Sequence, residues 1–86
     1  MNRAELLENV TVALSDRGSA YGDASENFQR IADMWSVILS RRVTVKEVAL
    51  CMAAVKMARL IETPDHEDSW IDLAGYAALG VEVNDR

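Results

Sequence analysis

The stretch that decides the fold is residues 68–79, which read DSWIDLAGYAAL. Its apolar and small side chains suit a buried helix, yet Asp68 and Asp72 stand four residues apart and therefore share one helical face. Carboxylates are costly to bury unless a cation or hydrogen-bond donors meet them. Three partners are open for this face: the basic side chains of Lys56 and Arg59, a divalent metal ion, or solvent.

The helix that contains this stretch is predicted to begin near Asp65 or Asp68 and to run to about Val83. Its middle is rich in alanine and contains Gly75 and Gly80. Each glycine lowers intrinsic helix stability by about 1 kcal/mol relative to alanine. We therefore expect both glycines to mark close packing against another element.

The preceding helix is predicted over about residues 45–62, with Thr44 and Glu47 in a capping box at its start and Pro64 after its end. Residues 48–55 are apolar on nearly all sides. Such a helix is typical of the centre of a bundle or of a subunit interface.

A first helix is predicted over residues 2–16, with Asn2 and Glu5 in a capping pattern and Arg17-Gly18 at its end. The side chains expected on its inward stripe are Leu6, Leu7, Val10 and Leu14.

A second helix is predicted over about residues 24–41, after a capping-box-like start at Asp23 and Glu26. The side chains expected to face inward from it are Phe28, Ile31, Trp35, Ile38 and Leu39.

The four helices predict one all-α domain over residues 1–86, a compact bundle with short connections. A chain of this length buries only about 60–65% of the surface that its unfolded form exposes, so a lone core is marginally stable. We therefore expect a homo-oligomer, a dimer or higher.

Charge and composition exclude several classes of partner. The formal net charge is −5 and the pI is about 4.7, whereas binding to a nucleic-acid backbone needs clustered Lys and Arg. No apolar run is long enough to span a bilayer, and no signal-peptide core precedes the first helix. The single cysteine, Cys51, lies in an apolar helix, which predicts a buried thiol in a reducing compartment. We expect a cytoplasmic protein with no membrane or nucleic-acid partner.

Three carboxylates, Glu26, Asp68 and Asp72, form the first candidate site. If the starts of their two helices adjoin, these side chains could hold Mg²⁺, which prefers carboxylate oxygens and water. They would then be catalytic as well as metal-binding. The alternative is structural, because acidic side chains in a first turn stabilise the helix dipole and cap its amides.

Lys56 and Arg59 are the second candidate, three residues apart on an otherwise apolar helix. They could clamp phosphate oxygens, or they could simply neutralise the two aspartates. A third cluster consists of Arg17, Tyr21 and Asn27 around the glycine-containing turn. It offers hydrogen bonds and a stacking ring for a base, or it stabilises the turn itself.

The remaining nucleophiles and bases give little support for a catalytic role. His66 lies in a Pro-Asp-His-Glu-Asp loop and is expected to be exposed and solvated. Ser25, Ser69 and Cys51 have no base partner at motif spacing, so nucleophilic catalysis is not supported.

The chain resembles a family of small phage and prophage proteins that form a domain of unknown function. The resemblance rests on three segments, which span nearly the whole chain: RGxxYGDxxENFxxIAxxW from residue 17, MxxxKxAR from residue 52 and DSxxDxAGY from residue 68. It implies a phage or prophage origin and action in the cytoplasm of a bacterial host.

A more distant likeness is to the all-α nucleotide pyrophosphohydrolases of the MazG and dimeric dUTPase type. It implies an oligomeric, Mg²⁺-dependent protein in which Glu26, Asp68 and Asp72 hold the metal and Lys56 and Arg59 bind the triphosphate. The sequence departs from that pattern, since it lacks a second Glu at position 29 or 30 and has Asp-x-x-x-Asp in place of Glu-x-x-Asp.

Two functions follow from these observations. One is a MazG-like protein that binds or cleaves nucleoside triphosphates, and the other is a non-enzymatic module that docks on a host defence or regulatory protein. A homodimer seam through the apolar helix is compatible with both.

Overall fold

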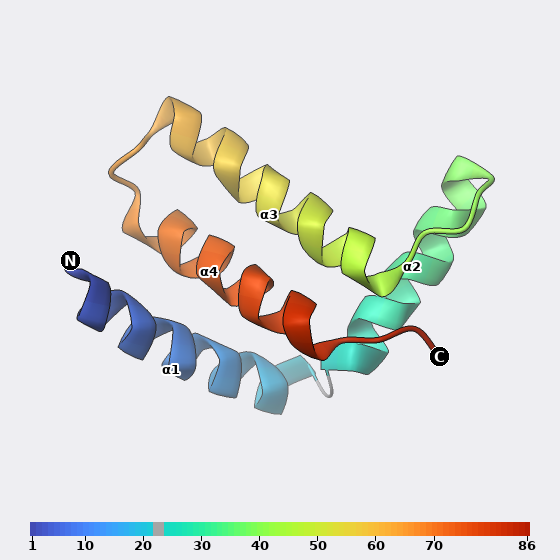
Figure 1. Cartoon of the computed structure of the whole chain (residues 1–86), viewed down its shortest axis with the longest axis horizontal. Coiled ribbons are helices and arrows are strands. Elements are labelled where there is room, and N and C mark those ends of the chain that lie inside the picture. The colour runs from blue at the N-terminus through green and yellow to red at the C-terminus, as the bar shows by residue number, and fades with distance from the viewer. Residues whose placement is uncertain (22–23) are drawn as a thin grey trace.

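Four helices make up the described part of the chain in the computed structural model (Figure 1). The structure describes residues 1–21 and 24–86, with side chains for 1–15 and 24–86. The helices are α1 (Arg3–Tyr21), α2 (Ala24–Leu39), α3 (Val45–Glu62) and α4 (Glu67–Glu82), and this part of the chain contains no strand. The all-α prediction is confirmed. Within the same residues, no helix is both long and apolar enough to cross a membrane.

The helices α1, α4 and α3 form a layer with α4 in the middle. Helix α2 crosses this layer at the end where α3 begins and α4 ends (Figure 1). The principal extents are 40 × 29 × 19 Å and the radius of gyration is 13.6 Å. A compact domain of this length has a radius of gyration of about 12 Å. The bundle is therefore flatter and more extended than predicted, because α1 and α3 pack on opposite sides of α4 and α2 covers only one end.

The start of α3 has the predicted capping box. The Glu47 N–H donates to Thr44 Oγ1 at 3.1 Å, and the Thr44 N–H donates to Glu47 Oε1 at 3.0 Å. The bond from the Thr44 backbone, followed by the bond from Arg41, lowers the pKa of the Glu47 carboxyl below its ordinary value. The box is therefore in its charged form at neutral pH. A feature that the local pattern did not indicate is the side chain of Asp85, which accepts a bond from the Val45 N–H at 3.2 Å.

The start of α1 also follows its prediction, since the Glu5 N–H donates to Asn2 Oδ1 at 2.9 Å. Its predicted end is wrong, because the helix continues through Gly18 to Tyr21. One glycine inside a helix costs only about 1 kcal/mol, which continued hydrogen bonding can offset. The predicted cap at Asp23 lies outside the described residues.

The core lies where α2, the start of α3 and the end of α4 meet. Val45, Val48 and Val83 are fully buried there. Phe28 of α2 lies among them, and its ring centroid is 6.4 Å from that of Tyr76 of α4. Ile31 and Trp35 pack against the same cluster, as predicted.

Three side chains expected to face inward are exposed instead: Leu7, Ile38 and Leu39. Because α2 crosses the layer at an angle, its last turns project beyond α3 (Figure 1). The helix also ends earlier than predicted, at Leu39, and is followed by Ser40 in the left-handed conformation with φ of 54°. Leu7 lies on a helix that packs chiefly on α4, so its outer side has no neighbour in the described chain.

The apolar stretch of α3 is not central, since α4 holds that place (Figure 1). Val48, Ala49 and Ala53 are buried, but Leu50 and Val55 are exposed. The thiol of Cys51 is exposed too, so the prediction of a buried cysteine is wrong. The sequence pattern indicated that α3 is apolar on nearly all sides, but the fold buries only the side that packs on the other helices.

The two glycines of α4 have different surroundings. A Cβ atom at Gly80 would lie 3.3 Å from the Cβ atom of Ala49, whereas a Cβ atom at Gly75 would lie 4.0 Å from Cδ2 of Leu14. The first distance is tighter than ordinary contact, and it can lengthen only if the helices move, because a Cβ atom is fixed in position by its own backbone. The predicted packing reason therefore holds at Gly80 and is weak at Gly75.

We predict that Gly75→Ala raises the free energy of unfolding by up to about 1 kcal/mol, because alanine is the better helix former and has room. The free energy of unfolding of Gly80→Ala is expected to be about 1–2 kcal/mol lower than that of Gly75→Ala, because α3 and α4 must move apart to make room for the added methyl group. Chemical denaturation of both variants and the parent checks this. Equal gains in the two variants would contradict the close approach of α3 and α4.

Candidate functional site

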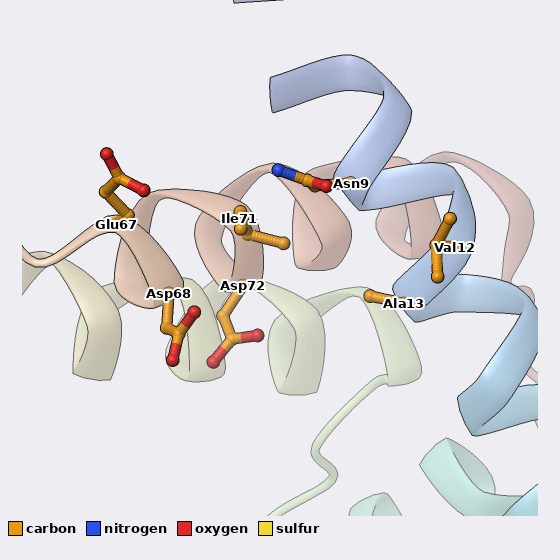
Figure 2. A pocket seen from close by; sticks show the side chains of 7 residues that line it. All are labelled: Asn9, Val12, Ala13, Glu67, Asp68, Ile71 and Asp72. Carbon is orange, nitrogen blue, oxygen red and sulfur yellow. The ribbon is translucent and has the colours of Figure 1, made fainter. Parts of the chain in front are cut away.

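A groove lies between α1 and the first half of α4 (Figure 2). Its volume is about 480 Å³. The groove is lined by Asn9, Val12 and Ala13 from α1 and by Glu67, Asp68, Ile71 and Asp72 from α4. Three of these seven side chains are carboxylates and three are apolar, so the groove combines a negative rim with an apolar lining.

The carboxylates of the groove do not all point the same way. Asp68 and Asp72 lie side by side and point toward α3, whereas Glu67 points away from them (Figure 2). The Glu67 carboxylate lies 3.2 Å from the amino group of Met1, which ties the start of α1 to the start of α4. Acidic side chains in this first turn are stabilised by the positive end of the α4 dipole.

Of the three partners left open for the aspartate face, the structure provides Lys56. Its Nζ lies 3.2 Å from Oδ2 of Asp72. The side chains of Lys56 and Asp72 are only 28% and 21% exposed, so this ion pair between α3 and α4 is partly shielded from water. Asp68 and Arg59 are both exposed.

The structure does not gather the three predicted metal ligands. Glu26 is exposed in the first turn of α2, which lies beside the far end of α4 from Asp68 and Asp72 (Figure 1). Among the residues with described positions, no group of three or more His, Cys, Asp or Glu side chains is placed to hold a metal ion. Asp72 also already has an ammonium partner in Lys56. The donor set of one chain therefore does not fit a three-carboxylate magnesium centre.

The cluster proposed for a base is only partly described. Asn27 is half-buried on α2, one residue before the core side chain Phe28. The side chains of Arg17 and Tyr21 lie outside the described part of the structure.

His66 is half-buried and not fully exposed, which corrects the prediction for this residue. It is the N-cap of α4, and its Nδ1 accepts a bond from the Ser69 N–H at 3.3 Å. The same nitrogen lies 2.7 Å from Oγ of Ser69, which is buried. Ser, Thr, Asp and Asn are the usual capping residues, so a histidine at this place gave no recognisable signal.

The groove also contains residues that sequence analysis did not identify. Glu67 could have been found, because it adjoins Asp68 in a first turn already rich in acidic side chains. Asn9 and Ile71 could not, because they become part of one surface only when α1 packs on α4.

Comparison with known proteins defines the class of the chain. It is 43% identical over 65 residues to the Gene 55 protein of Mycobacterium phage L5, a match that covers 73% of this chain and 41% of that protein. It is 36% identical over 77 residues to the Gene 55 protein of Mycobacterium phage D29, covering 90% of this chain and 51% of that protein. The chain thus spans about half the length of these relatives or less. No solved structure gives a significant match.

These relatives show that the chain is a phage protein. Residues 5–84 match the family described as a domain of unknown function, DUF6378, and the chain belongs to that family.

We predict that the Lys56–Asp72 pair contributes a measurable coupling between α3 and α4. In a double-mutant cycle with Lys56→Met and Asp72→Asn, we expect a coupling energy of about 0.5–1 kcal/mol in the free energy of unfolding. The matched control is Arg86–Asp33, whose atoms are 3.3 Å apart but whose side chains are 73% and 60% exposed. The control is expected to couple near zero, and equal coupling in both cycles would show that burial adds nothing to the Lys56–Asp72 pair.

Proposed function

We propose that this phage protein acts by binding a bacterial protein, and that the groove between α1 and α4 receives a basic, amphipathic segment of that partner. The observation that carries the proposal is the composition of the groove, where Glu67, Asp68 and Asp72 stand beside Val12 and Ile71. An amphipathic helix in a groove is recognised by its apolar face, while charges at the rim steer and orient it.

The charge balance of the chain supports the same partner chemistry. The formal net charge is −5, so the long-range field attracts positively charged surfaces and repels nucleic-acid backbones. Within the groove, Asp68 is exposed and Glu67 is 60% exposed. Lysine or arginine side chains of a partner can therefore reach both carboxylates without breaking the Lys56–Asp72 pair.

The first test uses a synthetic, Lys-rich amphipathic helix of about 20 residues as probe. We predict that Asp68→Asn weakens its binding about three- to tenfold, which corresponds to one partly exposed charge contact. Glu26→Gln removes the same charge from the first turn of α2, away from the groove, and is expected to leave the affinity unchanged. Fluorescence anisotropy at two salt concentrations measures both variants, and a loss of affinity at higher salt is expected for all.

Two results would contradict the proposal. One is equal binding by the parent and by Asp68→Asn. The other is equal weakening by Asp68→Asn and Glu26→Gln, because that would reflect net charge alone and would not involve the groove.

A second candidate function is the binding or cleavage of a nucleoside triphosphate, and one observation favours it. Asp68 and Asp72 lie side by side (Figure 2), and a Mg²⁺ ion held between such carboxylates could bind the oxygens of a phosphate ester. A MazG-like pyrophosphohydrolase would need Mg²⁺ and ligands beyond the two aspartates, because Glu26 of the same chain lies beside the other end of α4. This hypothesis predicts pyrophosphate release from a nucleoside triphosphate that depends on Mg²⁺ and is lost in Asp72→Asn. The Mg²⁺-dependent release of pyrophosphate separates this function from the binding of a basic segment.

A further inference from the structure

The outer face of α3 is an apolar surface that the fold leaves uncovered. We define it by the exposed side chains of Leu50, Ala54, Val55, Met57, Ala58 and Ile61. Leu50 is 69% exposed and Ile61 is 85% exposed. Figure 1 shows why, because α3 forms one edge of the helical layer and packs on α4 with its other side. Contiguous apolar surfaces of this kind mark interaction sites.

The spacing within the outer face is that of a helix-pairing seam. Leu50, Ala54, Met57 and Ile61 are separated by four, three and four residues, which is the a/d spacing of paired helices. Ala54 lies near the middle of the seam, where a small side chain lets a second helix approach. The face therefore fits a helix lying along it.

The total surface of the chain supports a second copy as the occupant. The accessible surface is 5916 Å², whereas a compact monomer of 9.5 kDa exposes about 5,000 Å². The excess of roughly 900 Å² is close to the surface of about 800 Å² that each partner buries in a stable dimer. One copy of the chain thus exposes more surface than a compact monomer does, by about the area that each partner buries in a dimer.

Charge also favours this face for self-association. Two copies that each carry a net charge of −5 repel one another, so they approach best through a surface without a net charge. The seam is apolar, and the anions at its ends have cations nearby: Glu47 is paired with Arg41 at 3.2 Å, and Glu62 stands three residues after Arg59. An antiparallel pairing avoids placing Glu47 against its own copy and aligns the two helix dipoles favourably.

We infer that the protein forms a two-fold symmetric homodimer in which the outer face of α3 packs against the same face of a second copy. A two-fold interface uses one patch twice, which suits a face that is complementary to itself. The inference does not depend on the proposed function, because the groove between α1 and α4 lies on the other side of the helical layer.

The test compares the mass of the parent and of single variants by sedimentation equilibrium. The parent is expected to have twice the single-chain mass of 9.5 kDa at micromolar concentration. Leu50→Glu and Ile61→Glu are each expected to raise the dimer dissociation constant at least about a hundredfold, because each would bury two unpaired carboxylates per dimer. Circular dichroism should show unchanged helix content, since both side chains are exposed in the single chain.

Leu7→Glu is the matched control, because Leu7 is 65% exposed on α1, at the opposite edge of the layer. This variant is expected to remain dimeric. A monomeric parent would overturn the inference, as would a dimer that survives both α3 substitutions. A dimer broken by Val37→Glu on α2 but not by Leu50→Glu would place the interface on the projecting end of α2 and would overturn it as well.

Discussion

The close approach of α3 and α4 is the constraint on which the rest of the structure depends. Gly80 permits it, because a side chain there would meet Ala49. The approach buries Val45 and Val48, and the residues after α4 then follow the start of α3, where Val83 is buried and Asp85 binds the Val45 N–H. At the other end, the Lys56–Asp72 ion pair joins the same two helices. Apolar packing and one shielded ion pair thus fix a single hairpin of helices.

This hairpin determines which surfaces remain open. Because α4 lies between α1 and α3, the acidic groove forms on the α1 side and the apolar outer face forms on the α3 side (Figure 1). The two surfaces differ in chemistry, so they suit different occupants. A dimer formed through α3 would keep both grooves accessible and would present two copies of the same acidic site, which raises the effective concentration for a partner with two basic segments.

Features that depend on neighbouring residues could be predicted from the sequence, and features that depend on tertiary placement could not. The Thr44–Glu47 capping box and the Asn2–Glu5 cap each form within one helical turn, so the local sequence pattern was sufficient to predict them. Helical period identified Ile38 and Cys51 as apolar-helix residues, but it could not tell that their sides stay uncovered. For the candidate site, the pairing of Asp72 with Lys56 was one of three open alternatives. The separation of Glu26 from both aspartates followed only from the path of α2.

Amide hydrogen exchange measured along the native chain tests the central claim most directly. If the α3–α4 hairpin is the structural unit, amides of residues 48–53 and 75–79 exchange slowest, at the rate set by global unfolding. Amides of residues 6–14 exchange faster through local opening, because Val10 is the one buried side chain among those described in α1. Equal protection of α1, or faster exchange in α3 and α4 than in α1, would contradict the account.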